Sequence, residues 1–248
     1  MPTLETKNIK KHFEGVKAVD GLSLKFEAGQ ITGVVGPNGS GKSTLVNLLT
    51  GMAPYQDGEV IFSGAEGLRK LLPHEVANYG VARTFQDVRL FEQMPVLDNI
   101  LVVLTERGVF SSIFERHGDF HLAQAEEVLR KVGLWSKRNE LAVNLSYGQR
   151  KLLEIARVLA MIFGRGASIV FLDEPFAGLF PEMIKVVVSV LEELKQQNRT
   201  IILIEHNMEL IRQLSDHVYV LDAGQELAAG KPEKALGRPE VIEAYLGE

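Results

Sequence analysis

The sequence predicts an α/β protein with an N-terminal antiparallel β part and an inserted helical subdomain. Through about Phe62, short alternating apolar runs are separated by Gly and Asp turns, as in a β-rich segment. Between about Asp87 and Phe163, apolar residues recur at intervals of three and four, which is the period of amphipathic helices. From Ser168 onward, continuous apolar β-branched runs alternate with helical ones, which is typical of a mostly parallel sheet covered by helices.

The predicted elements fall into these three stretches in chain order. We expect one domain, 1–248, with the core and β part at about 1–86 and 164–248 and the helical subdomain at 87–163. The elements are strands Leu4–Ile9, Leu22–Phe26, Ile31–Val35 and Glu59–Phe62 around a helix Lys42–Thr50, then helices Val96–Thr105, His121–Val132 and Tyr147–Phe163, then strands Ile169–Leu172, Thr200–Ile204 and Val218–Leu221 alternating with helices Glu182–Gln197 and Met208–Leu214.

The composition excludes several classes of protein. The 248 residues include 27 basic and 32 acidic side chains, a formal charge of −5, and no cysteine. Without cysteine there is no disulfide framework, thiolate zinc site, iron–sulfur cluster or cysteine nucleophile. A chain of this length buries enough apolar surface to fold without such staples. Its 46% hydrophobic and 24% charged residues are typical of a globular protein and not of a disordered or fibrous one.

The sequence contains no candidate membrane span or secretion signal. The longest apolar runs, Ala167–Leu172 and Val186–Leu191, are far shorter than the ~18 residues that a spanning helix needs. The stretch Met1–Glu5 has no basic region followed by an apolar core, so we expect a cytoplasmic protein. The net negative charge disfavours nucleic acid as a partner, because phosphate backbones attract basic surfaces.

A glycine-rich segment lies between the predicted strand Ile31–Val35 and the helix beginning near Lys42. It matches G-x-x-x-x-G-K-[ST], in which backbone N–H groups and a helix N-terminus point at phosphate oxygens. We expect Lys42 to bind the β- and γ-phosphates of a nucleotide and the Ser43 hydroxyl to bind Mg²⁺. A glycine-rich turn with a solvated lysine is the alternative. The predicted phosphate-binding residues are Gly36, Pro37, Asn38, Gly39, Ser40, Gly41, Lys42, Ser43 and Thr44.

Two acids, Asp173 and Glu174, follow the predicted strand Ile169–Leu172 and precede Pro175, which ends the strand. Ligands of parallel sheets bind beyond the carboxyl ends of the strands, so both acids are expected to face the phosphates. We expect Asp173 in the Mg²⁺ shell and Glu174 beside the attacking water, as general base or positioning group. Adjacent strand residues point to opposite sides, so this requires the chain to turn at Glu174. A solvated pair of acids in a turn is the alternative.

A third motif, Leu-Ser-Tyr-Gly-Gln, occupies residues 145–149 before the predicted helix. Ser146 and Gln149 have the spacing of a capping box, which by itself only starts a helix. A capped helix start is also an anion site, and Gly148 leaves the approach to it open. With the glycine-rich loop and the two acids, this order resembles the ATP-binding cassette family, whose LSGGQ-type signature is matched with Tyr147 in third position.

The resemblance covers the chain from Leu4 to about Leu246. It implies a RecA-like P-loop NTPase core and an ATP hydrolase, with 1–248 as a single nucleotide-binding domain. In that family two cassettes bind head to tail, and the signature of one closes on the γ-phosphate held by the other. Carried over, Ser146, Gly148 and Gln149 would complete a site in trans.

The resemblance also implies roles for residues outside these motifs. Gln86 matches the Q-loop glutamine that senses Mg²⁺ and the attacking water, although a surface glutamine after a strand is the plainer interpretation. His206 matches the switch histidine that bonds the γ-phosphate, and a structural histidine is its alternative. Phe13 matches the aromatic residue that stacks on adenine, backed by Val16 or Ala18, although Phe13 could equally lie in the core.

One position departs from the family pattern. The D-loop of the family commonly reads S-A-L-D, whereas residues 177–180 here read Ala-Gly-Leu-Phe. Phe180 therefore stands where an Asp or Asn usually contacts the partner cassette. We expect Phe180 to pack at the dimer seam.

The stretch Val81–Phe91 and the ending Glu243–Gly247 are similar to the branched-chain amino-acid importer branch, which also includes urea and related amide importers. This implies a peripheral subunit on the cytoplasmic face of the cell membrane. Its partners would be a second cassette, identical or paralogous, separate permease subunits and a solute-binding protein. Within Thr105–Phe120, the aromatic residues Phe110, Phe114 and Phe120 are candidates for permease docking or for the core.

Two other functions stay open from the sequence. An exporter ATPase, such as that for lipopolysaccharide, is similar in size and also lacks a fused span. A cassette ATPase acting on DNA repair or ribosomes would predict duplicated cassettes, a long coiled coil or a basic arm, and the sequence has none of these. A non-hydrolytic protein is disfavoured because Glu174 and His206 are both present.

Overall fold

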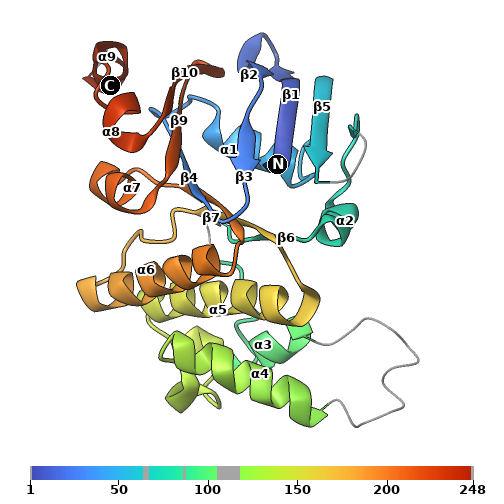
Figure 1. Ribbon diagram of the computed structural model, residues 1–248. Helices are drawn as coiled ribbons and strands as arrows, with labels where there is room; N and C mark the ends of the chain where they lie inside the picture. Colours follow the sequence, from blue (N-terminus) through green and yellow to red (C-terminus); the bar gives the residue numbers. More distant parts are fainter. Residues whose placement is uncertain (1, 64–66, 86–87, 105–117, 247–248) are drawn as a thin grey trace. The chain divides into compact units, whose positions relative to one another are not determined.

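The computed structural model describes residues 2–63, 67–85, 88–104 and 118–246, and the chain divides into two compact units. The sheet unit comprises Met1–Arg83, Ser168–Glu174 and Leu191–Glu248. The helical unit comprises Thr84–Ala167 and Pro175–Val190. Figure 1 labels the elements of both units along the chain.

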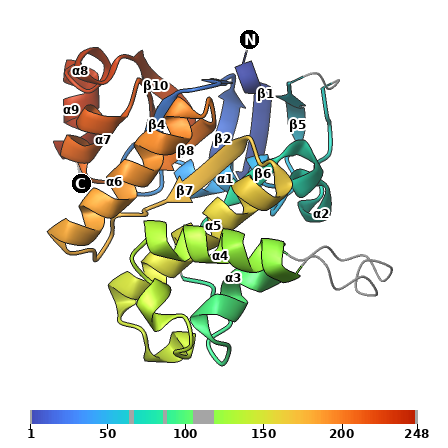
Figure 2. The same ribbon diagram turned by 60° about the horizontal axis from the view of Figure 1, so that its bottom comes forward.

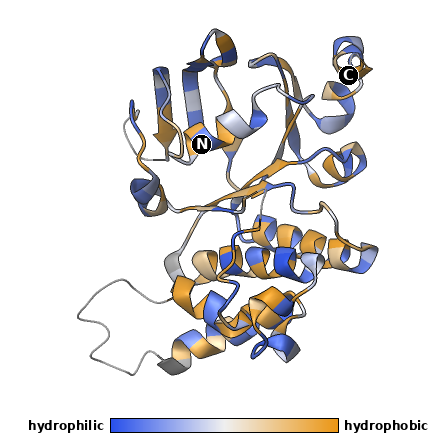
Figure 3. Cartoon of the chain, turned by 180° about the vertical axis from the view of Figure 1, so that it is seen from behind, coloured by the Kyte–Doolittle hydropathy of each residue, from blue (hydrophilic) through white to orange (hydrophobic). Residues whose placement is uncertain are grey.

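The first sheet of the sheet unit has six strands in the order β10-β9-β4-β8-β7-β6. Its pairs are parallel except for β9 with β10, which is antiparallel. Every residue of β4, β7 and β8 is buried, which is why these strands read as continuous apolar runs; Figure 3 colours such strands as mostly hydrophobic. The strands, several of them labelled in Figure 2, are β4 (Ile31–Val35), β6 (Val81–Arg83), β7 (Ile169–Asp173), β8 (Thr200–Ile204), β9 (His217–Asp222) and β10 (Gln225–Gly230).

The second sheet is antiparallel and centred on β1 (Pro2–Phe13), which pairs with β2 (Val16–Leu22), β3 (Lys25–Glu27) and β5 (Asp57–Phe62). The single strand predicted at Leu22–Phe26 is wrong, because the chain there ends β2 and begins β3.

A side chain of β1 bonds into the break between β2 and β3. The Thr6 hydroxyl donates to the Leu22 carbonyl at 3.1 Å and accepts from the Leu24 N–H at 2.9 Å. A side chain thus replaces part of the backbone ladder, and the two strands are separate.

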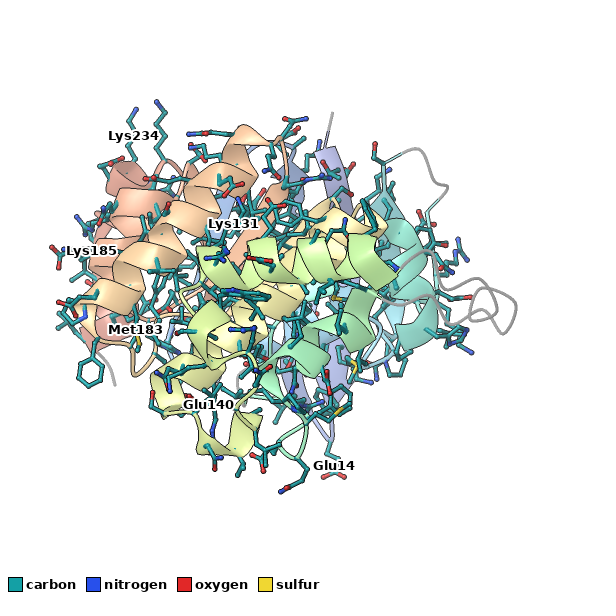
Figure 4. All side chains as sticks on the ribbon, turned by 90° about the horizontal axis from the view of Figure 1, so that it is seen from below. Glu14, Lys131, Glu140, Met183, Lys185 and Lys234 are labelled. Carbon is teal, nitrogen blue, oxygen red and sulfur yellow. The ribbon has the colours of Figure 1, made fainter. Side chains whose placement is uncertain are left out.

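Three strands have no counterpart among the predicted ones. Most of β2 and β10 is exposed or half-buried, and β6 is three residues long. β6 and β10 are also the outermost strands of their sheet. The low burial of β2 and β10 and the shortness of β6 leave each without the continuous apolar run on which the predictions depended. β2 follows β1 across the turn at Glu14 and Gly15, both with positive φ, and Glu14 extends away from the ribbon in Figure 4.

Helices complete the sheet unit. α1 follows the glycine-rich loop directly, and its Leu45, Leu48 and Leu49 are buried in the same core cluster as Val34 and Phe171 of the sheet. The helices of this unit are α1 (Lys42–Leu49), α2 (Pro73–Val76), α7 (Met208–Leu214), α8 (Pro232–Ala235) and α9 (Pro239–Leu246), with the 3-10 turn η1 (Ala77–Tyr79).

The helical unit is built around α5, which packs against α3 and α4. Its helices are α3 (Val96–Leu104), α4 (Gly118–Lys131), α5 (Tyr147–Arg165) and the first part of α6 (Pro181–Gln196), with 3-10 turns η4 (Trp135–Lys137) and η5 (Ala142–Asn144). Over the described ranges, the helices are each too short or too polar to cross a bilayer.

Candidate functional site

The carboxyl ends of three neighbouring strands of the sheet unit bring the predicted site residues together. β8 lies between β4 and β7, and Ile204 near its end is in register with Val34 of β4 and with Asp173 of β7. The glycine-rich loop leaves β4 two residues after Val34. The phosphate loop, the acids and the residues after β8 therefore meet at one edge of the sheet, which is where α/β proteins bind ligands.

The turn required at Glu174 is present. Asp173 is the last residue of β7, and Glu174 has a left-handed φ of 48°, an uncommon conformation for a residue with a side chain. Its N–H donates to the Ile204 carbonyl at 2.9 Å. The change in backbone direction allows both adjacent acids to serve the same edge of the sheet.

Glu174 and His206 are in contact at this edge. Glu174 Oε1 lies 3.3 Å from His206 Nε2, with 22% and 45% of the respective side chains exposed. The residue after His206, Asn207, caps α7, because its Oδ1 accepts from the N–H groups of Glu209 and Leu210. The cap fixes where α7 begins and hence where the loop carrying His206 ends. A carboxylate and an imidazole are thus held together beside the phosphate loop.

The phosphate loop carries one nearly buried cation. Lys42 is 6% exposed, and its ammonium donates to the carbonyls of Gly36 and Pro37 at 2.7 and 2.8 Å. Lys42 is also the first residue of α1, whose N-terminus receives no hydrogen bond from a capping side chain. The N–H groups of the first turn and the lysine charge both favour an anion at this place.

The loop is tightly constrained by the neighbouring backbone. Gly41 has a φ of 101°, and a Cβ built on it would lie 2.1 Å from the carbonyl oxygen of Ala18 on β2. Gly224, in the turn between β9 and β10, donates its N–H to the Ser40 carbonyl at 3.1 Å, and its own carbonyl accepts from the Asp20 N–H at 2.8 Å. The β1–β2 hairpin is thereby tied to the phosphate loop.

Of the predicted adenine contacts, Phe13 and Val16 pair across the hairpin and are exposed, at 48% and 66%. An aromatic ring in this position is available for stacking and is not part of the core. Ala18 is half-buried. At the hairpin base, hydrogen bonding from Lys17 is the main cause of a lowered pKa of Asp20.

The signature segment lies in the helical unit and starts α5 as a capping box. The Ser146 hydroxyl accepts from the Gln149 N–H at 3.3 Å, and the Gln149 side chain accepts from the Ser146 N–H at 3.1 Å. Arg150 holds the segment before α5 by donating hydrogen bonds to the carbonyls of Val143 and Leu145, at 2.7 and 3.1 Å. The helix start is fixed by local interactions, as its sequence pattern predicts.

The signature packs against the D-loop position within the helical unit. A Cβ on Gly178, where φ is 70°, would lie 2.8 Å from Cε1 of the Tyr147 ring. A Cβ on Gly148 would meet the sulfur of Met183, a residue of α6 labelled in Figure 4, at 2.6 Å. Tyr147 in the third signature position is thus accommodated by a glycine in the D-loop. Phe180 stays 70% exposed.

The sequence of this chain was compared with protein-family models and with known proteins. The model of the ABC transporter family matches residues 19–177. A probable branched-chain amino acid transport ATP-binding protein, LivG of Archaeoglobus fulgidus, is 35% identical over 257 residues, spanning 100% of this chain and 96% of that protein. The high-affinity LivG of Escherichia coli K12 is 38% identical, spanning 100% and 98%. This chain belongs to the ABC transporter family.

Solved cassettes agree with this assignment. A nucleotide-free ATP-binding cassette from an ABC transporter superposes with a TM-score of 0.85 at 33% identity, covering 100% of both chains. The ADP conformation of such a cassette gives a TM-score of 0.85 at 34% identity, again with 100% coverage of both. The predicted fold class, an α/β P-loop NTPase core, and the predicted family are confirmed.

Some predicted residues of the cassette lie outside the described residues. They are Gln86 and two of the docking candidates, Phe110 and Phe114, whereas Phe120 of α4 is described and 60% exposed. Phe85 and Arg89 are held by α5, because the buried Glu154 carboxylate accepts hydrogen bonds from their backbone N–H groups. Burial raises the pKa of Glu154.

Three residues that contact the predicted motifs were not among the predicted site residues. Arg83 contacts Asp173, Gly224 ties the hairpin to the phosphate loop, and Gly178 receives Tyr147. Arg83 stands three residues before Gln86 and could have been singled out as a charge at a strand end. The two glycines carry no local signal, because their constraint comes from segments distant in the sequence.

Proposed function

We propose that this chain is the ATP-hydrolysing subunit of an ABC importer for branched-chain amino acids or a related small polar solute, such as urea or another amide. The contact between Glu174 and His206, beside a glycine-rich phosphate loop at one sheet edge, carries the enzymatic part of the proposal. The full-length similarity to branched-chain amino acid transport ATP-binding proteins supports the importer. In this reading residues 1–248 act as a single nucleotide-binding domain.

The phosphate loop binds the substrate. Backbone N–H groups of the non-proline residues in 36–44 and the N-terminus of α1 surround the phosphates, and Lys42 supplies a full positive charge to the β- and γ-phosphates. Phe13 of the exposed hairpin stacks on adenine, with Val16 and Ala18 beside it. Because the Gly224 turn ties the hairpin to the loop, base and phosphates are held by one connected frame.

The chemical step is an in-line attack of water on the γ-phosphorus. Glu174 orients the water and takes its proton as the new P–O bond forms and the bond to the ADP oxygen breaks. His206 donates to a γ-phosphate oxygen, and its contact with Glu174 keeps both groups directed at the same phosphorus. Gln86 stands next to this water in the proposal.

Mg²⁺ fits the donors present at this edge. The Ser43 hydroxyl is exposed in the first turn of α1, and the Asp173 carboxylate ends the strand on the other side of β8. Oxygen donors of this kind suit a hard cation that keeps several waters and shares the phosphates. Ser43, Asp173 and Gln86 are the proposed ligands, and the ion would neutralise charge on the phosphates.

A second cassette completes each site. Ser146, Gly148 and Gln149 of one copy face the γ-phosphate held by the other, using the N-terminus of α5 as an anion site. Tyr147 and Phe180 are exposed at 54% and 70% in the helical unit, as a contact with the partner requires. Phe180→Asp is expected to weaken ATP-dependent dimerisation, measured by size-exclusion chromatography with the Glu174→Gln background. Unchanged dimerisation in that background, together with unchanged turnover of Phe180→Asp alone, would contradict this role for Phe180.

The chain works with other subunits. It attaches peripherally to the cytoplasmic face of the membrane by binding separate permeases, with Phe120 of the helical unit and the neighbouring Phe110 and Phe114 as docking candidates. A solute-binding protein delivers the solute, and nucleic acid is not a partner. Whether the second cassette is an identical copy or a paralogue is read from the native complex purified from membranes.

Glu174→Gln tests the enzymatic part. The amide keeps the size of the side chain but cannot accept the proton, so turnover should fall by roughly 10²–10⁴-fold while ATP binding persists. Glu182→Gln, an exposed acid at the start of α6, is the matched control. Full turnover in Glu174→Gln would remove Glu174 from the mechanism.

The transport part is tested in proteoliposomes holding the co-purified permeases. Uptake of labelled leucine or urea that depends on ATP supports import, whereas loss of solute from loaded vesicles would indicate an exporter instead.

A further inference from the structure

Arg83 connects three elements of the sheet unit. It is the last residue of β6, and its side chain is 11% exposed. Nη1 donates to Asn47 Oδ1 and to Thr50 Oγ1, both at 2.8 Å, and Nη2 lies 3.5 Å from Asp173 Oδ2. One guanidinium therefore bridges the helix that follows the phosphate loop and the strand that ends in the acids.

The two acceptors, on α1 and on its C-cap residue, are suited to fix the guanidinium. Asn47 lies in the last turns of α1 and Thr50 directly after its end, three residues further along the chain. The Thr50 hydroxyl donates its proton to the Val46 carbonyl at 2.7 Å, which directs a lone pair of Oγ1 toward Arg83. The planar fork then presents Nη2 to Asp173 in a defined direction.

The buried Asp173 carboxylate is stabilised by a positively charged partner such as Arg83. Its side chain is 4% exposed, and a buried carboxylate is costly unless it is paired and hydrogen-bonded. The contact with Arg83 is through Oδ2, so it also sets the rotation of the carboxylate group. Ligand orientation of this kind is what residues behind a metal ligand usually provide.

We propose that Arg83 is a positioning residue that orients the Asp173 carboxylate toward the Mg²⁺ of the bound nucleotide. The inference rests on the proposed function, since it concerns how that ATP site holds its metal. A purely structural Arg83, which only neutralises a buried acid, predicts lost stability with no separate effect on metal affinity.

The test measures Mn²⁺ binding by electron paramagnetic resonance, with ADP bound to the purified full chain. Arg83→Lys keeps the charge but loses the fork, so Mn²⁺ affinity should fall by roughly 10–100-fold. Asn47→Ala keeps both charges and removes one anchor of the fork, and it should weaken Mn²⁺ binding less, in the same direction. Arg212→Lys, at an exposed position of α7, is the matched control and should leave it unchanged.

A second readout separates positioning from stability. ADP affinity measured in EDTA should stay within about twofold of wild type in all three variants, because the phosphate loop itself is intact. The Mg²⁺ concentration that half-saturates ATP hydrolysis should rise in Arg83→Lys and, less, in Asn47→Ala. Circular dichroism melting identifies any unfolded variant. If Arg83→Lys does not fold, the Mn²⁺ affinity of Asn47→Ala tests the proposal. That variant is expected to fold because alanine favours the helix.

Two results would overturn the proposal: a folded Arg83→Lys or Asn47→Ala with wild-type Mn²⁺ affinity, or equal losses of ADP affinity with and without metal. Failure of the wild-type chain to bind ADP would instead reject the proposed function.

Discussion

Different kinds of atom lie close to Gly41 of the phosphate loop and to Gly148 and Gly178 of the signature region. A Cβ on Gly41 would lie 2.1 Å from a backbone carbonyl of β2, whereas Cβ atoms on Gly178 and Gly148 would meet the side chains of Tyr147 and Met183. A backbone carbonyl inside a sheet cannot move without the strand, while a side chain can change rotamer. The phosphate loop is therefore held in place by backbone that cannot move independently, whereas the signature region is held by side chains that can change rotamer.

The largest effect is expected at Gly41. Gly41→Ala combines a backbone clash with a left-handed conformation, and it should destabilise the chain by about 2–5 kcal/mol and remove nucleotide binding. Urea unfolding and ADP titration measure the two consequences. Gly39→Ala is the matched control, because Gly39 also has a positive φ but nothing lies within 4 Å of its Cβ. Similar losses of stability in urea unfolding of both variants would contradict the role of the β2 carbonyl.

A smaller and recoverable effect is expected at Gly178. Gly178→Ala should cost about 1–3 kcal/mol, from the left-handed backbone and the displaced Tyr147 ring. The double variant with Tyr147→Ala should recover part of this loss, with a coupling energy of about 0.5–3 kcal/mol in a double-mutant cycle. Strict additivity would show that the ring and the glycine do not interact, and the contrast with Gly41 would then fail.

The smallest effect concerns pH and the helix that carries the signature. Burial is the main cause of the raised pKa of Glu154, so the folded chain binds a proton there more readily than the unfolded chain. Its contribution to stability is therefore greatest below the unfolded pKa and is lost as pH rises through the folded pKa. Glu154→Gln should remove this part of the pH dependence, measured as thermal midpoints between pH 4 and 7. An unchanged profile would contradict the assignment.

Local patterns in the sequence were sufficient for several elements. Ser146 and Gln149 form the capping box that their spacing predicts, and β8 and α7 begin and end where predicted. These features depend on residues within a few positions of one another. Even the turn at Glu174 was required by the adjacency of the two acids, and φ at that residue provides it.

Other features depended on distant segments. The strand predicted at Leu22–Phe26 is divided because the Thr6 side chain forms hydrogen bonds with Leu22 and Leu24. The sequence pattern around residues 22–26 does not indicate this contact. β2 and β10 are mostly exposed or half-buried, and β6 is only three residues long, so none of them shows a continuous apolar run. The roles of the site residues remain predictions, with Gln86 outside the described residues.

By itself, the sequence determined which chemical groups are present: a phosphate loop, two acids after an apolar strand, a histidine after another and a capped signature helix. Only the tertiary structure decided that β8 lies between β4 and β7, so that Glu174 reaches His206, and that Arg83 joins α1 to Asp173. Strand order and register arise from the burial of whole faces against one another. A sequence motif identifies its own residues, whereas the packing of the complete sheet determines which distant residues they contact.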